Sequence, residues 1–343
     1  MKALVHDGGG QILLEDRPEP VVSLTTDAIV RMTKTTLCGT DLQSLTGDTR
    51  NRAPGRVLGH EGVGVIHAKG TDVRRFDVGD HVLIAGITSC GTCDYCLKQI
   101  YGHCREGGRI LGRTIDGTQA EFVRIPHAEN SLYAIPAVAD EDALVTLSDI
   151  LPTSFECSGV PVRIRPGSAV AIVGAGPIGL AALLMVRRHA PAAILMIDID
   201  DNRLKVAETF GATALVNSAD EPVRDVVMAL TQGRGVDIAI EAVGVIETFA
   251  LCERIVAGGG TIANVGIHGT QVNLFLDRLW HRNITLTTHR ADAPDTPAAL
   301  AGSGHGRAAS LLRYRFELRQ ILYAYDVFGR ASANRALKVI VDI

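Results

Sequence analysis

The sequence lacks an excess of charge of either sign. It has 34 Lys and Arg against 38 Asp and Glu, a formal net charge of −4 at pH 7. Nucleic acids and anionic membrane surfaces are bound through basic patches, so we expect neither of them as a partner. The stretch MKALVHDGGG at the N-terminus also lacks an apolar h-region. We therefore expect no signal peptide and a cytoplasmic protein.

Internal repeats and low-complexity segments are likewise missing. Hydrophobic residues make up 46% and charged residues 21% of the chain, a balance typical of globular and not of disordered proteins. The 343 residues suffice for two domains that each bury a core. The single tryptophan, Trp280, is expected in such a core, with a place near the substrate pocket or a subunit interface as the alternative.

Cysteine is too scarce for a disulfide scaffold, since there are only seven in the chain. Four of them follow the pattern C-x2-C-x2-C-x7-C, at Cys90, Cys93, Cys96 and Cys104. Four thiolates at this spacing can close a tetrahedron around Zn²⁺ and leave no position for water or substrate, which indicates a structural zinc site. The alternatives are an iron–sulfur cluster or free thiols.

The strongest pattern lies between Ser168 and Asp198. An apolar run typical of a buried strand is followed by G-x-G-x-x-G, an apolar helical pattern and a second strand ending on Asp198. This order predicts a strand, a tight turn and a helix whose N-terminus holds the pyrophosphate of a dinucleotide, with Asp198 near the ribose. The residues of the turn are Gly174, Gly176, Pro177, Ile178 and Gly179.

The same stretch runs without a charge from residue 168 to residue 186, so a membrane helix is the alternative. Pro177 and three glycines interrupt it, which only the strand–turn–helix interpretation explains. Asp198 also bears on the cofactor, because a carboxylate there repels the 2′-phosphate of NADP. Arg203 lies nearby but is outnumbered by three carboxylates, those of Asp198, Asp200 and Asp201. We therefore expect NAD.

Two patterns divide the chain. Residues 1–155 hold β-type runs separated by turn signals, with strands expected at 28–32, 62–67, 80–85 and 120–125. Residues 156–290 alternate strands and helices and predict a doubly wound parallel sheet. Its six strands are expected at 169–173, 194–198, 214–216, 236–241, 261–265 and 284–288. Residues 291–343 carry both helix and strand signals and are expected to return to the first domain.

A second group of candidate ligands stands in the first domain. Cys38 lies in the stretch CGTD, and His60 and Glu61 lie in GHEG. A thiolate, an imidazole and a carboxylate form a mixed ligand set for Zn²⁺ that can leave one position open. Taken alone, Cys38 could be a core residue and His60 a hydrogen-bonded turn residue. Because a dinucleotide-binding pattern and a four-cysteine lobe accompany them, we favour a catalytic zinc site.

Over essentially its whole length, the chain resembles the zinc-dependent medium-chain alcohol dehydrogenase family, and within it the bacterial NAD-dependent secondary-alcohol enzymes. The matching motifs are CGTD (38–41), GHEGVG (59–64), GD (79–80), the four-cysteine lobe, GTQAEFVRIP (117–126), LSDILPT (147–153) and GAGPIG (174–179). The resemblance implies an α/β protein: a GroES-like β-rich catalytic domain plus a Rossmann domain, with the active site in the cleft between them.

The resemblance also implies the ligands of the catalytic zinc. They are Cys38, His60 and Asp149, the last at a position that other members fill with cysteine or glutamate. Glu61 resembles the family's glutamate beside the zinc histidine, which lies near the metal and can replace water as a ligand. The alternative role for Asp149 is an N-cap ahead of residues 152–155.

Other roles follow from the same resemblance. Thr40 resembles the hydroxyl residue that accepts the alcohol proton, but Gln43 replaces the histidine that continues the relay in many members. Thr153 resembles the threonine beside the nicotinamide, and Arg203 resembles the basic residue near the adenosine ribose. The backbone that holds the nicotinamide carboxamide is expected at Val265, Gly266 and Ile267.

The sequence therefore predicts reversible hydride transfer between NAD and small primary or secondary alcohols, with one catalytic and one structural zinc per chain. Asp149 as a ligand favours secondary alcohols and ketones. Polyol, threonine or formaldehyde dehydrogenases of the same family, and a non-catalytic paralogue that binds zinc and NAD, are the alternatives. Residues 290–315 match the family weakly. The resemblance also implies a homodimer or homotetramer.

Overall fold

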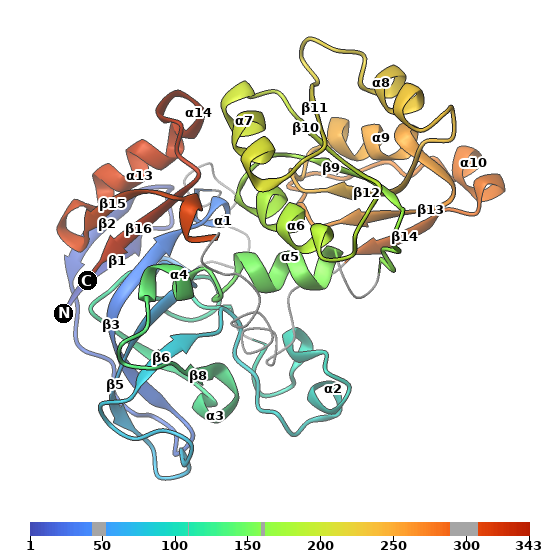
Figure 1. Cartoon of the computed structure of the whole chain (residues 1–343). Coiled ribbons are helices and arrows are strands. Elements are labelled where there is room, and N and C mark those ends of the chain that lie inside the picture. The colour runs from blue at the N-terminus through green and yellow to red at the C-terminus, as the bar shows by residue number, and fades with distance from the viewer. Residues whose placement is uncertain (43–52, 109, 159–161, 289–307) are drawn as a thin grey trace. The chain divides into compact units, whose positions relative to one another are not determined.

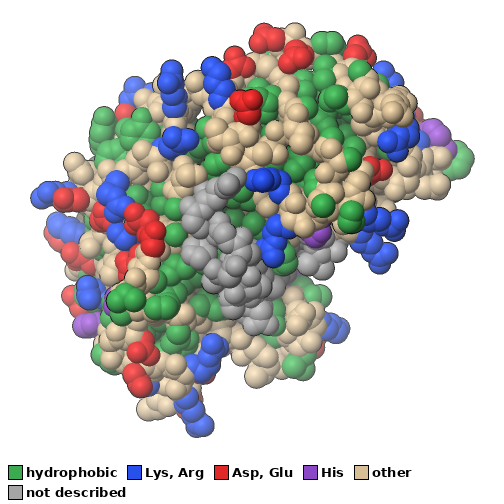
Figure 2. Space-filling view, in the orientation of Figure 1, with side chains coloured by type: hydrophobic (Ala, Val, Ile, Leu, Met, Phe, Trp, Pro, Cys, Tyr) green, Lys and Arg blue, Asp and Glu red, His purple; other side chains and the backbone are tan. Residues whose placement is uncertain are grey.

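The computed structural model describes residues 1–42, 53–108, 110–158, 162–288 and 308–343 (Figure 1). The chain forms two compact units. Unit 1 combines Met1–Pro152 with Asp292–Ile343, and unit 2 is Thr153–Ala291. Within the described residues, no helix has the length and apolar character that crossing a membrane requires. On the face drawn in Figure 2, basic and acidic side chains are interspersed.

Unit 2 is built on a six-stranded parallel sheet. Its strands are β9 (Ala169–Val173), β10 (Ala193–Asp198), β11 (Ala214–Asn217), β12 (Val236–Glu241), β13 (Val256–Asn264) and β14 (Thr285–Thr288). The strand order is β11-β10-β9-β12-β13-β14, and every pairing is parallel. The order reverses at β9, which is the arrangement of a doubly wound dinucleotide-binding sheet. The predicted fold class is confirmed.

Helices cover the sheet in two pairs, with α6 against α7 and α8 against α9 (Figure 1). They are α6 (Pro177–Arg187), α7 (Asp201–Phe210), α8 (Val223–Leu230) and α9 (Ile246–Ile255), followed by α10 (Leu276–Leu279) and η2 (Trp280–Arg282). Pro177 starts α6, where its missing N–H costs no hydrogen bond. The uncharged stretch thus contains a strand and an 11-residue helix, and the membrane-helix alternative is wrong.

Two details of unit 2 differ from the sequence-based expectations. Strand β13 begins at Val256, five residues before the expected start, because Val256 pairs with Val236 across a register shift. The glycine run at 258–260 hid this extension, since glycine is disfavoured inside strands. Trp280 is 74% exposed, whereas the preceding Leu279 is 6% exposed. Successive helical residues point about 100° apart, so only Leu279 faces the core, and the prediction of a buried Trp280 is wrong.

Unit 1 contains two sheets. The larger has the order β15-β16-β3-β5-β6-β8, with β7 also paired to β3, and the smaller has the order β2-β1-β4. The strands are β1 (Lys2–His6), β2 (Ile12–Asp16), β3 (Ala28–Leu37), β4 (Arg56–Val57), β5 (Gly62–Lys69), β6 (His81–Ile84), β7 (Phe122–Ile125), β8 (Leu132–Ala134), β15 (Leu312–Glu317) and β16 (Lys338–Asp342). The long strand β3 lies at the centre and pairs with β5, β7 and β16.

Short helices connect these strands. They are α1 (Gly39–Leu42), α2 (Asp94–Leu97), η1 (Tyr101–His103), α3 (Ala128–Ser131), α4 (Glu141–Val145), η3 (Ala309–Leu311), η4 (Leu318–Gln320), α13 (Ile321–Gly329) and α14 (Ala331–Asn334). Helix α5 (Ile150–Ser158) begins in unit 1 and continues into unit 2. The C-terminal segment joins the large sheet through β16, which pairs antiparallel with β3, and β15, which runs parallel to β16. Residues from both ends of unit 1 therefore share one core.

Gly179 tests the packing of α6 against the glycine turn. A Cβ at Gly179 would lie 1.8 Å from the backbone oxygen of Gly174, and backbone cannot yield as a side chain can. We expect Gly179→Ala to destabilise unit 2 by about 3 kcal/mol, measured by urea denaturation. Gly258→Ala is the control, because its Cβ would meet nothing closer than 3.8 Å. Equal stability of the two variants would contradict the packing described here.

Candidate functional site

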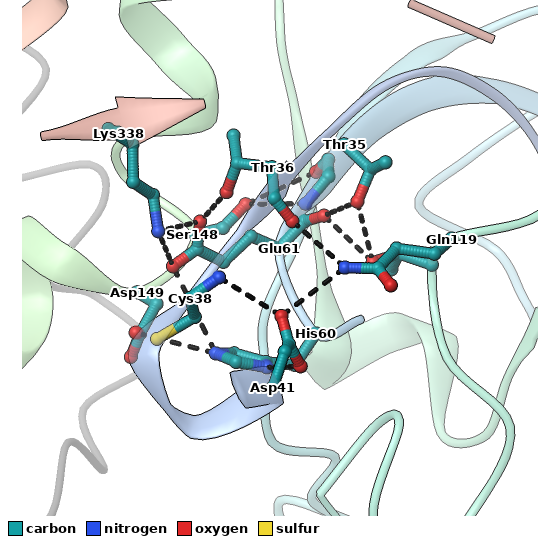
Figure 3. A network of polar contacts seen from close by, with 12 residues as sticks. Thr35, Thr36, Cys38, Asp41, His60, Glu61, Gln119, Ser148, Asp149 and Lys338 are labelled. Carbon is teal, nitrogen blue, oxygen red and sulfur yellow. Dashed lines mark hydrogen bonds and ion pairs between the residues drawn. The ribbon is translucent and has the colours of Figure 1, made fainter. Parts of the chain in front are cut away.

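Four predicted ligands converge in unit 1. Cys38 follows β3, His60 and Glu61 precede β5, and Asp149 directly precedes α5. One ligand atom from each lies within 4.8 Å of all the others. Figure 3 shows the four side chains turned toward one another. His60 Nε2 lies 3.5 Å from an Asp149 oxygen and 3.9 Å from a Glu61 oxygen.

This donor set fits Zn²⁺. Zinc–ligand bonds of about 2.0–2.3 Å require ligand atoms about 3.3–3.8 Å apart in a tetrahedron, close to the spacing around His60 Nε2. A thiolate, an imidazole and carboxylates are the ligand types that catalytic zinc uses. The Asp149 carboxylate lies 3.5 Å from His60 Nε2, a distance that suits two ligands of one metal ion.

The electrostatics of His60 fit a ligand that faces anions. Burial by itself lowers the pKa of His60, but hydrogen bonds to Asp149 and Cys38 and the charge of Asp41 outweigh it and raise the pKa well above its usual value. Asp41 faces the other ring nitrogen, with its Oδ1 3.7 Å from His60 Nδ1. A carboxylate behind a metal-binding histidine holds the ring and its tautomer in place. The sequence singled out neither this contact nor the burial of Asp41, which is 1% exposed.

A second group that sequence reasoning missed is Lys338, the first residue of β16. Its side chain is 1% exposed, and its Nζ lies 2.7 Å and 2.6 Å from the two Glu61 oxygens. Thr36 donates its hydroxyl hydrogen to the same carboxylate. The only sequence signal was a lysine directly before the apolar run VIV. A surface lysine can equally stand at the start of a buried strand, so this signal does not indicate burial.

The pair is fully buried, and its charges depend on each other. Burial raises the pKa of Glu61 to about 7, although the Lys338 charge acts in the lowering direction. Burial acts to lower the pKa of Lys338, but the charges of Glu61 and Cys38 raise it above its usual value. Lys338 is therefore the cation that opposes the effect of burial on Glu61, beside the other candidate ligands.

The other metal-ligand cluster is the four-cysteine lobe. The sulfur atoms of Cys90, Cys93, Cys96 and Cys104 all lie within 4.8 Å of one another. A hydrogen bond from the Arg105 backbone lowers the pKa of Cys93 to about 6, whereas burial raises the pKa of Cys96 to about 12. A divalent cation would stabilise all four as thiolates, which is the composition of a closed structural zinc site.

In unit 2 the glycine turn lies between β9 and α6. Gly174 has a φ of +106°, and a Cβ there would lie 2.6 Å from Val243. Asp198, at the end of β10, accepts hydrogen bonds from the backbone N–H groups of Ala175 (2.6 Å) and Asp200 (2.9 Å). The Asp198 carboxylate is thus tied to the turn. Arg203, on α7, has its guanidinium 4.0 Å from where a Cβ on Gly176 would be.

The remaining predicted residues fall in several places. Val265, Gly266 and Ile267 follow β13, and the N–H groups of Val265 and Gly266 donate to the Glu241 backbone oxygen. Thr153 lies in α5 and Thr40 in α1. Pro177 and Ile178 open α6. Gln43 lies outside the described residues.

Known proteins match the chain closely. The family model for the alcohol dehydrogenase GroES-like domain matches residues 25–137, and the model for zinc-binding dehydrogenases matches residues 177–301. An alcohol dehydrogenase of Cupriavidus necator is 33% identical, with 99% of this chain and 98% of the relative covered. The NADP-dependent isopropanol dehydrogenase of Thermoanaerobacter brockii is 32% identical, with 74% and 72% covered.

A solved structure gives the same result. The apo form of zinc dependent alcohol dehydrogenase 2 from Streptococcus pneumonia aligns with a TM-score of 0.94 and 44% identity, covering 100% of this chain and 98% of the other. The fold and these matches define an oxidoreductase of a class that uses zinc and a nicotinamide cofactor. The chain belongs to the zinc-dependent medium-chain alcohol dehydrogenase family, whose members act on alcohols and carbonyl compounds.

Lys338→Met tests the buried ion pair. Removing the cation leaves Glu61 as an unpaired buried carboxylate, so we expect a loss of about 3 kcal/mol or more in the free energy of unfolding. Urea denaturation of the metal-free protein measures it, and adding Glu61→Gln should recover part of the loss. Lys34→Met is the matched control, since Lys34 pairs with Asp342 while 19% exposed and should cost about 1 kcal/mol. Equal losses would contradict this account.

Proposed function

We propose that the chain catalyses reversible hydride transfer between NAD and small alcohols, with secondary alcohols and ketones as the preferred pair. The observation that carries the proposal is the mixed cluster of Cys38, His60, Glu61 and Asp149 in a chain of this family. A closed structural site needs no such mixture, whereas a catalytic zinc uses three protein ligands and an open position.

In this proposal Cys38, His60 and Asp149 hold the catalytic zinc, and the four cysteines of the lobe hold a structural one. The catalytic zinc supplies Lewis-acid chemistry, which lowers the pKa of an alcohol hydroxyl and polarises a carbonyl. Asp41 keeps the His60 ring oriented from its Nδ1 side. Lys338 and Thr36 hold Glu61 close to the site without leaving its carboxylate free.

The proton released from the alcohol passes in this proposal to Thr40, which stands two residues after Cys38. Its hydroxyl can accept one proton and donate another, which a relay requires. Gln43 cannot extend the relay by titrating. Asp41 is the nearest carboxylate in sequence, but its oxygens face Cys38, Gln119 and His60. Water is therefore the favoured route beyond Thr40.

Support for NAD comes from Asp198. Its carboxylate is fixed at the end of β10 by two backbone N–H groups, where it can accept hydrogen bonds from ribose hydroxyls and repel a 2′-phosphate. Thr153 and the backbone of residues 265–267 are assigned to the nicotinamide. NADP is the second candidate, because the isopropanol dehydrogenase relative is named as NADP-dependent and Arg203 stands beside the turn.

Support for secondary alcohols comes from two sources. Asp149 occupies the third ligand position, as in the bacterial secondary-alcohol enzymes that the sequence resembles. The Thermoanaerobacter brockii relative, whose name specifies isopropanol, aligns over 74% of the chain.

Activity is tested by NADH formation on ethanol, 2-propanol, 2-butanol, benzyl alcohol, sorbitol, threonine and formaldehyde, with zinc measured on the same sample. We expect turnover of 2-propanol and 2-butanol above the others, at two zinc ions per chain. Cys38→Ala should lose one zinc and at least about 100-fold in kcat. Cys252→Ala, which removes a buried thiol of α9 in unit 2, should keep both. Absence of turnover at full zinc and NAD occupancy would overturn the proposal.

Cofactor choice is tested with Asp198→Asn, which removes the charge and keeps the shape of the side chain. A hydrogen bond to a charged group contributes about 1.5–3 kcal/mol. We therefore expect the ratio of kcat/KM for NAD to that for NADP to fall about 10-fold or more. Asp201→Asn makes the same charge change on the exposed side of α7 and should leave the ratio within about 2-fold. A wild-type preference for NADP would contradict the assignment.

We also propose a homodimer or homotetramer formed through unit 2. Strand β14 is the last strand of its sheet, and edge strands offer unpaired backbone groups to a partner. Several exposed apolar side chains lie on or near it in sequence: Leu274, Phe275, Leu276, Trp280 and Leu286. Trp280→Glu should shift the mass measured by light scattering toward the monomer.

A further inference from the structure

A buried chain of hydrogen bonds leads from helix α13, in the C-terminal segment, toward the candidate catalytic metal site. The Tyr325 hydroxyl donates to Gln119 Oε1 at 2.8 Å. Gln119 Nε2 donates to Asp41 Oδ2 at 3.2 Å, and Asp41 Oδ1 faces His60 Nδ1. The exposed fractions of Tyr325, Gln119 and Asp41 are 3%, 0% and 1%. In Figure 3, a dashed line joins the Gln119 amide to Asp41, which lies beside the His60 ring.

The Gln119 amide has one orientation that satisfies every partner. Its Nε2 meets two acceptors, Asp41 Oδ2 and the Thr36 backbone oxygen, both at 3.2 Å. Its Oε1 meets the Tyr325 hydroxyl. A flipped amide would place an oxygen against two acceptors, which costs free energy in a buried site. The two acceptors therefore select the orientation in which the amide donates to Asp41, and the Tyr325 hydroxyl, by donating to Oε1, holds the amide in that orientation.

The backbone of Gln119 is held as firmly as its side chain. Its N–H donates to the Leu58 oxygen, and its oxygen accepts from the Leu4 N–H, both at 2.9 Å. Gly59, the residue before His60, has a φ of +89°, and a Cβ there would lie 2.6 Å from Gln119 Cγ. The backbone that carries the Gln119 amide is therefore held in place, next to the segment that carries His60.

Asp41 contacts two of the candidate ligands, Cys38 and His60. Its Oδ2 accepts hydrogen bonds from the Gln119 amide and from the Cys38 N–H at 3.0 Å. Because these two donors hold Oδ2, the other oxygen faces His60 Nδ1 at 3.7 Å, and among the described residues no hydrogen bond engages that oxygen. The Gln119 amide therefore decides which Asp41 oxygen serves His60.

We propose that Gln119 and Tyr325 are positioning residues for the metal site: Tyr325 holds the Gln119 amide in place, the amide fixes Asp41, and Asp41 restrains His60 and the backbone of Cys38. The inference rests on the proposed zinc site. Removing a group behind a metal ligand costs about 10–100-fold in metal affinity. If Gln119 and Tyr325 hold the site in this way, the wild-type chain should release its catalytic zinc more slowly than variants that lack either side chain.

The experiment measures zinc release from the full chain into excess EDTA, followed with a chromogenic zinc indicator. Tyr325→Phe removes one hydroxyl and keeps the ring, and we expect the catalytic zinc to leave about 10-fold faster. Gln119→Leu should approach about 100-fold. Release from the four-cysteine lobe should stay unchanged and provides an internal reference in the same trace.

The matched control is Tyr314→Phe. The Tyr314 hydroxyl donates to the Asn334 backbone oxygen at 2.7 Å, so the control removes one tyrosine hydrogen bond from the same unit. Both tyrosine variants should show small decreases in melting temperature, but only Tyr325→Phe should release zinc faster. Tyr325→Phe keeps the proposal testable even if Gln119→Leu fails to fold.

Three outcomes separate the claims. Wild-type release kinetics in Tyr325→Phe, or equal acceleration in Tyr314→Phe, would overturn the positioning roles. A wild-type chain that binds only one zinc would overturn both the roles and the proposed function. Faster zinc release in Tyr325→Phe, in a protein that turns over no alcohol, would support the positioning roles and reject the dehydrogenase proposal alone.

Discussion

The candidate catalytic site depends on charge compensation in a buried place. Cys38, Glu61 and Asp149 are three anionic groups in their metal-binding forms, and their ligand atoms lie within 4.8 Å of one another and of His60. A divalent cation would balance two of these charges, and the Lys338 ammonium balances the third. Such a cluster is unstable if any one charge is missing. The buried lysine is therefore as much a part of the site as the ligands are.

The pairing of two strands that lie far apart in the sequence makes this charge compensation possible. Strand β3 carries Thr36 and ends before Cys38, and β16 pairs with it through Leu37 and Val339, which places Lys338 beside the ligands. Helix α13 packs in the same core and supplies Tyr325. The C-terminal segment thus contributes two polar side chains to a site whose ligands all come from the first 149 residues.

The sequence alone predicted those parts of the protein that are encoded by a local sequence pattern. The six parallel strands, the glycine turn and the four-cysteine lobe each follow from residues close together in the chain. Cys38, His60 and Glu61 were grouped from their residue types and the motifs that accompany them, and Asp149 was added only by the family resemblance. Lys338, Gln119 and Tyr325 could not be found in this way, because their importance comes from burial and from partners between 78 and 277 residues away. Trp280 was misplaced for a related reason: its exposure depends on the direction of one short helical turn.

The order of the segments along the chain has a consequence for biosynthesis. Unit 2 is continuous, whereas unit 1 is interrupted by it and needs β16 to complete its large sheet. On the ribosome, Cys38, His60, Glu61 and Asp149 emerge long before Lys338, so the anionic ligands wait without their buried cation while all of unit 2 is synthesised. By the time Lys338 is synthesised, the whole of unit 2 has already been made. We therefore expect metal capture at the candidate catalytic site to come late, coupled to the docking of the last strand.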